Sequence, residues 1–93
     1  MFDIRIKATG TTKEGLYITS ESKISCSNEE GVATDLGKFL YSIECMGFDF
    51  NTGDVYNQAI EAFNNTVTDS RYNTIYKSKS DSFVLEVATR KRL

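Results

Sequence analysis

The first 26 residues alternate between apolar and polar side chains. In residues 2–8 every second side chain is apolar and the intervening ones are charged. A period of two is typical of a strand with one buried face. Residues 16–26 repeat the pattern, with serines weakening the middle. We predict two strands joined by a hairpin loop over residues 9–15, the second strand either bulged or lying at an edge of the sheet.

Hydrophobic residues then recur at steps of three and four over residues 32–46, which predicts an amphipathic helix. Ser27, with Glu30 three residues later, matches a capping box and predicts the helix start. Gly47 is suited to end the helix. Gly37 lowers helix stability by about 1 kcal/mol relative to alanine, so we expect it to allow close packing against another backbone.

The second half of the chain adds one helix and two strands. A helical stripe covers residues 55–63, and Thr52 or Asp54 is the expected N-cap. Residues 71–77 alternate and predict a strand. Residues 83–88 are apolar on most of both faces, which indicates a central strand, and we place it beside the first strand.

The predicted order is therefore β-β-α-α-β-β. Strands at both ends with helices between them favour an α+β two-layer sandwich, with two helices on one face of a mostly antiparallel four-stranded sheet. A chain of 93 residues is expected to form a single domain, residues 1–93. The polar side chains of the first two strands predict that the other face of the sheet contacts water.

The composition removes several kinds of chemistry. The chain has no histidine, so Ser-His-Asp and Cys-His nucleophile systems and imidazole zinc sites are excluded. Cys26 and Cys45 are too few for an all-thiolate metal site. We expect both to be free thiols, with a disulfide between them as the alternative. No cofactor, metal or enzymatic activity is predicted.

The chain also lacks targeting signals. The N-terminus alternates charged and apolar residues, whereas a signal peptide needs a continuous apolar stretch. No run approaches the roughly 20 apolar residues of a membrane-spanning helix. We therefore expect a cytoplasmic protein that does not bind membranes.

The overall net charge of −2 conceals a division along the chain. Residues 27–69 carry eight carboxylates against Lys38 alone, a net charge of −7. Residues 70–93 carry six cations against two carboxylates, a net charge of +4, and residues 1–26 have a net charge of +1. The predicted helical layer is thus acidic and the strand layer neutral to basic, which fits two different partners.

The leading functional hypothesis is a non-enzymatic binding protein, acting as an inhibitor or regulator, that docks its acidic helical layer onto a basic groove of a protein partner. Charge would steer the association, and aromatic side chains would anchor it. The alternative interpretation is helix capping and a solvated surface. The residues expected to carry the interaction are Glu29, Glu30, Asp35, Glu44, Asp49, Asp54, Glu61, Phe48 and Tyr56.

The alternative function is nucleic-acid binding by a basic, tyrosine-bearing strand layer and a basic C-terminal tail. Alternation over residues 71–77 puts Tyr72 and Tyr76 on one face. A homodimer through the edge of the second strand is a further possibility. The residues of the nucleic-acid alternative are Arg5, Lys7, Tyr17, Tyr72, Tyr76, Arg90, Lys91 and Arg92.

In size, single α+β domain, absence of a catalytic set and acidic mid-section, the chain resembles small accessory proteins of bacteriophages and other mobile elements. These include anti-defence proteins of the anti-CRISPR type. The resemblance implies a stoichiometric inhibitor of a nucleic-acid-handling defence protein, such as a CRISPR effector, in the bacterial host cytoplasm. It rests on no motif, so it assigns no role to any individual residue.

Overall fold

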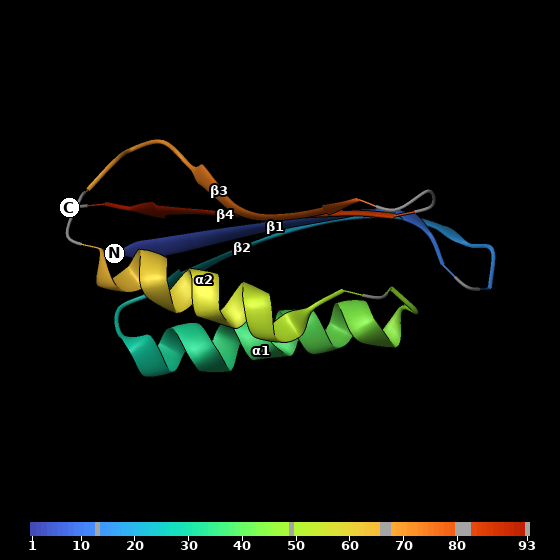
Figure 1. The fold of residues 1–93 in the computed structure, drawn as a ribbon, viewed down its shortest axis with the longest axis horizontal. Coiled ribbons are helices and arrows are strands. Elements are labelled where there is room, and N and C mark those ends of the chain that lie inside the picture. The colour runs from blue at the N-terminus through green and yellow to red at the C-terminus, as the bar shows by residue number, and fades with distance from the viewer. Residues whose placement is uncertain (13, 49, 66–67, 80–82, 93) are drawn as a thin grey trace.

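The structure is a computed structural model that describes residues 1–12, 14–48, 50–65, 68–79 and 83–92. Four strands form one antiparallel sheet, and two helices running in opposite directions lie against one of its faces (Figure 1). The predicted α+β order is confirmed. The elements are β1 (Phe2–Thr11), β2 (Tyr17–Cys26), α1 (Glu29–Cys45), α2 (Thr52–Asn64), β3 (Asn73–Lys79) and β4 (Phe83–Lys91).

The strand order is β2-β1-β4-β3, so the first and last strands pair at the centre of the sheet, as predicted. β1 pairs with β2 along the full length of both strands without a register shift. β2 is therefore a regular edge strand, and the bulge that the serines suggested is absent from its pairing with β1. The sheet instead has its irregularity in β3, between Thr74 and Tyr76.

The core fills the space between the sheet and the helices. Ile4 of β1 and Leu85 of β4 face Leu36 of α1 and Val55 of α2 across this layer, and all four are fully buried. Burying a side chain of this size stabilises a fold by about 1.5–3 kcal/mol. α1 packs over β2, while α2 packs over β3 and β4, so each helix covers one half of the same face.

Both helix N-caps are asparagines beside the expected positions, Asn28 one residue after Ser27 and Asn51 one residue before Thr52. The side chain of Asn28, rather than Ser27, accepts the backbone N–H three residues on, at 2.7 Å. Asn51, rather than Thr52 or Asp54, does the same for α2 at 3.1 Å. Asparagine caps as well as serine, so the local sequence offered neighbouring candidates that propensity alone could not separate.

Candidate binding surfaces

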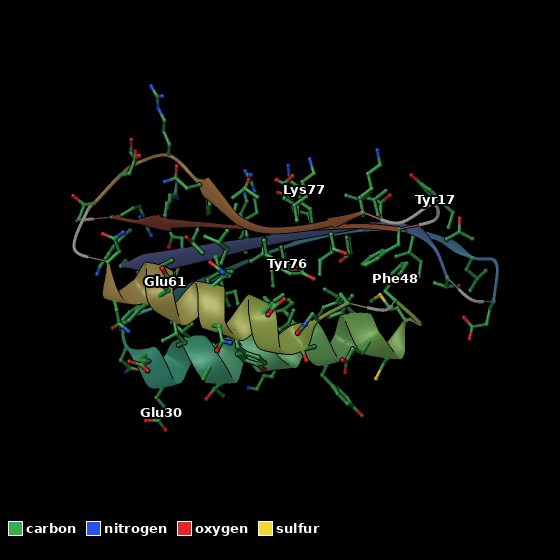
Figure 2. The ribbon with its side chains drawn as sticks, viewed as in Figure 1. Tyr17, Glu30, Phe48, Glu61, Tyr76 and Lys77 are labelled. Carbon is green, nitrogen blue, oxygen red and sulfur yellow. The ribbon has the colours of Figure 1, made fainter. Side chains whose placement is uncertain are left out.

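The face of the sheet opposite the two described helices is basic, and we call it the open face. Figure 2 shows Tyr17 and Lys77 pointing away from the helices on this side. The strand registers and the contacts of Arg92 put seven cations and three carboxylates here. They are Arg5, Lys7, Lys23, Lys77, Lys79, Arg90 and Arg92, with Asp3, Glu21 and Glu86.

One end of the open face is organised around Asp3. Its side chain is only 3% exposed. Oδ1 accepts from Ser25 Oγ at 2.7 Å and from Arg92 Nη2 at 3.0 Å, and Oδ2 accepts from Arg90 Nε at 2.7 Å and from Arg92 Nε. Burial raises the pKa of Asp3, but hydrogen bonds from Arg92, Arg90 and Ser25 outweigh it and hold the pKa well below its usual range.

Tyr72 holds two guanidinium groups on the open face. The Cζ atoms of Arg5 and Arg90 each lie 4.6 Å from the centre of its ring, within the range of a cation–π interaction. Ala88, opposite Arg5 in the sheet, is buried on this side. Because its ring already contacts two cations, Tyr72 positions Arg5 and Arg90 rather than offering a free platform for a base. Within the described residues, Arg5 Nε is buried without an acceptor.

Four charged residues form a row across the middle of the open face. Glu21, Lys7, Glu86 and Lys77 are successive partners on the four strands, so charges of opposite sign alternate along the row. Within the described residues, the glutamates of the row form ion pairs with neighbours outside it, Glu86 with Arg5 at 3.8 Å and Glu21 with Lys23 at 3.9 Å. The row is neutral as a whole, so the positive excess of the open face comes from the residues on either side of it, while Lys77 at the end of the row is exposed.

Two residues of the predicted nucleic-acid set lie on the other face. The bulge in β3 turns Tyr76 toward the helices, where its hydroxyl accepts from the backbone N–H of Asn51 at 3.4 Å (Figure 2). Lys91 also points to the helix side, and Nζ donates to the carbonyls of Phe63 and Asn65 at 2.7 Å each. It thereby supplies a cation at the C-terminal end of α2, which has no basic residue in its own last turn.

The expected C-terminal basic arm is part of the sheet. Arg90 and Lys91 belong to β4, and Arg92 continues its pairing with β1, its N–H donating to the carbonyl of Met1 at 2.9 Å. The three residues predicted to form a basic tail therefore continue the last strand instead. Three consecutive basic residues alternate across a strand, so two of them reach Asp3 and the middle one reaches α2.

The helical layer carries exposed carboxylates, as the charge division predicted, and we call this surface the acidic face. It consists of Glu29, Glu30, Glu44, Asp54 and Glu61. Asp35 is half-buried, and its Oδ2 accepts from Cys26 Sγ at 3.9 Å. Burial and the nearby Asp35 carboxylate raise the pKa of the Cys26 thiol. Asp49, also predicted to contact a partner, lies outside the described residues.

Of the two predicted aromatic anchors, Phe48 is in the core and Tyr56 packs against it. Phe48 is 5% exposed, and its ring stacks on Phe83 with centroids 4.1 Å apart. Tyr56 is half-buried and packs against α1. The exposed aromatic residue of the acidic face is instead Tyr41, 69% exposed, which sequence reasoning missed. Tyr41 lies outside the apolar stripe of α1, and this position was the feature of the sequence that indicated its exposure.

A hollow of about 270 Å³ lies between α2, β3 and β4. Its charged side chains are already engaged: Asp69 accepts from the Arg71 N–H, Arg90 donates to Asp3, and Lys91 caps α2. Elsewhere in the described chain, no three side chains that bind metals come together. Cys26 is buried and Cys45 exposed, and both are free thiols.

None of the helices in the described residues is both long and apolar enough to cross a membrane. Comparisons of the chain with family models, curated proteins and solved structures find no match.

Proposed function

We propose that the chain is a non-catalytic binding protein that holds single-stranded nucleic acid on the open face. The supporting observation is a charge separation between the two layers: cations outnumber carboxylates on the uncovered sheet face, while the helices on the other side are acidic. A negatively charged strand is attracted to one layer and repelled by the other, which gives binding a single orientation.

The side chains of the open face divide between two roles. Lys23, Lys77 and Lys79 are exposed lysines suited to contact phosphates. Tyr17, 72% exposed at the far end of β2, offers a free ring on which a base can stack. Arg5 and Arg90 are held by Tyr72, so their guanidinium planes are ordered before a ligand arrives.

The test is a fluorescence-anisotropy titration with a labelled single-stranded oligonucleotide at several salt concentrations. We expect the wild-type chain to bind on the order of 1–10 µM at low salt. The Lys77→Glu/Lys79→Glu variant should bind at least about ten-fold more weakly and reduce the magnitude of the salt slope by about 1.4, because two phosphate contacts to a single strand are lost.

The matched control is Lys38→Glu, which makes the same charge change on the helical layer. It should leave affinity and salt slope close to those of the wild type. If the wild-type chain fails to bind at low salt, or if Lys38→Glu weakens binding as much as the open-face variant does, the proposal is wrong.

A second candidate is docking of the acidic face onto a basic protein surface, and the exposure of Tyr41 beside Glu44 favours it. Exposed tyrosines are frequent anchors in interfaces, and carboxylates around them would steer a basic partner. The resemblance to phage anti-defence proteins makes a nucleic-acid-handling protein with a basic groove the expected partner.

For this candidate the measurement is quantitative affinity capture from the native host, comparing three chains by mass spectrometry. Tyr41→Ala/Glu44→Lys should lose a protein that both the wild type and Lys77→Glu/Lys79→Glu retain. A captured protein that both variants retain, or that both lose, would count against docking through the acidic face.

A further inference from the structure

The outer edge of β2 is a regular strand with a free edge. It is ten residues long, and within the described chain it pairs only with β1. The unpaired backbone groups of such an edge are a template for another strand. The other edge strand, β3, is shorter, has a bulge between Thr74 and Tyr76, and exposes two lysines. These features protect an edge, so only β2 is left suited to pairing.

The charges of β2 select its partner. On the open face it carries Glu21 and Lys23, whose side chains are 48% and 63% exposed, with Nζ 3.9 Å from Oε1. A lysine in the middle of an edge strand normally discourages pairing with an arbitrary strand. An antiparallel copy of β2 centred on Ser22 removes this obstacle, because each lysine then lies opposite a glutamate of the other copy.

We propose that the chain forms a two-fold dimer in which β2 pairs antiparallel with β2 of a second copy, with Ser22 at the axis. Glu21 then lies opposite Lys23 of the partner subunit, and the reverse pair forms by symmetry. Centring the pair on Glu21 or on Lys23 instead would put like charges directly opposite each other. The charge pattern therefore selects one register.

Apolar side chains beside β2 support the same partner. Ile18 and Ile24 face the helix side of this strand and are only half-buried. On α1, Phe39 and Met46 are half-buried and lie on the same side of the helix as Asp35, which accepts from Cys26 of β2. A second copy at this edge would remove part of this apolar surface from water.

The acidic face does not oppose this arrangement. Gly37 of α1 faces Tyr56 of α2, on the side of α1 away from Asp35. Glu30, Tyr41 and Glu44 lie toward that same side by helical spacing. The two α1 helices would therefore approach each other across the axis with the sides that carry Phe39, Met46 and the half-buried Asp35. The two open faces would join into one eight-stranded surface.

The experiment is sedimentation equilibrium of the full chain, with two single charge reversals. Glu21→Lys and Lys23→Glu each put like charges at both positions, so each should weaken the dimer by about ten-fold or more. Mixing the two variants restores opposite charges and should give a heterodimer. The double swap Glu21→Lys/Lys23→Glu should recover the wild-type dimer.

Lys79→Glu is the matched control, because it reverses a lysine on the other edge strand and should leave the dimer unchanged. Circular dichroism checks that each variant is folded, and the mixing experiment compares variants that are already folded alone. A monomeric wild type at the highest soluble concentration, or single variants that dimerise like the wild type, would overturn the proposal.

The dimer and nucleic-acid proposals fail independently. Dimerisation is measured without nucleic acid. Glu21→Lys should weaken the dimer, and it adds a positive charge to the open face. The affinity of each chain for an oligonucleotide should therefore be retained. Loss of dimerisation with retained binding supports both proposals, and an undiminished dimer in this variant contradicts only the dimer.

Discussion

At the scale of single residues, Asp3 is the side chain that organises one end of the open face through its hydrogen bonds. A carboxylate on the uncovered side of a strand would ordinarily be solvated, yet Asp3 is buried beneath Arg90 and Arg92 and accepts from Ser25. A buried carboxylate is stable only when it is paired and hydrogen-bonded in this way. Asp3 therefore ties β2 and the C-terminal end of β4 to β1.

Replacing Asp3 with asparagine should lower the free energy of unfolding by about 1–3 kcal/mol, since two guanidinium groups lose a charged acceptor while remaining partly solvated. Chemical denaturation at neutral pH measures the change. Glu61→Gln is the control, because it also converts a carboxylate to an amide, at an exposed position of the acidic face, and should cost less than about 0.5 kcal/mol. Equal effects of the two variants would contradict the role given to Asp3.

The same contacts predict a dependence on pH. The folded-state pKa of Asp3 is lowered from its ordinary value of 3.8. Its contribution to stability is therefore complete above about pH 5 and is lost as pH falls through 4 and below. Denaturation midpoints measured between pH 6 and pH 2 should fall less steeply for Asp3→Asn than for the wild type. Parallel profiles would show that another carboxylate dominates.

At the scale of elements, the packing of α1 on α2 depends on Gly37. A Cβ at this position would lie 2.5 Å from the hydroxyl oxygen of Tyr56, which is closer than real Cβ contacts. The glycine thus makes room for a side chain, whereas the sequence led us to expect a neighbouring backbone. Gly47, just after α1, has φ +89° and ends the helix as predicted.

Gly37→Ala should stabilise the protein only when the Tyr56 hydroxyl is absent. At a helix position with space for a Cβ, replacing glycine with alanine raises the free energy of unfolding by about 1 kcal/mol. Here the Tyr56 ring must shift, so the gain should be lost in the wild-type background and recovered in a Tyr56→Phe background. A thermodynamic cycle of the four chains measures this coupling, and we expect about 1 kcal/mol or more. Additive effects would refute the contact.

At the scale of the whole molecule, the chain has two layers of opposite charge. In the proposed function, repulsion by the acidic helices would confine a bound nucleic-acid strand to the open face, and the proposed dimer would extend that face across the β2 edge. The predictions for Lys77→Glu/Lys79→Glu and for Glu21→Lys belong to this scale, because each concerns a surface through which the whole molecule would meet a partner: the open face for nucleic acid and the β2 edge for a second copy.

The candidate sites show which side-chain positions the sequence pattern could predict and which it could not. Alternation correctly predicted that Arg5 and Lys7 lie on the side of β1 opposite the buried face, because side chains on a regular strand alternate between its two sides. It failed for Tyr76, because a bulge inserts an extra residue and changes the face of everything after it. It also failed for Phe48, since a connector residue has no period from which its burial could be inferred.

The sequence by itself determined the element types and order, the two-layer arrangement and the acidic character of the helices, because periodicity, capping and charge are local properties of a chain. Only the tertiary structure decided which charges meet. Asp3 and Arg90 are 87 residues apart, and only the pairing of β1 with β4 brings them to 2.7 Å. Register, bulges and burial depend on contacts between distant segments, and these contacts form only when the chain folds.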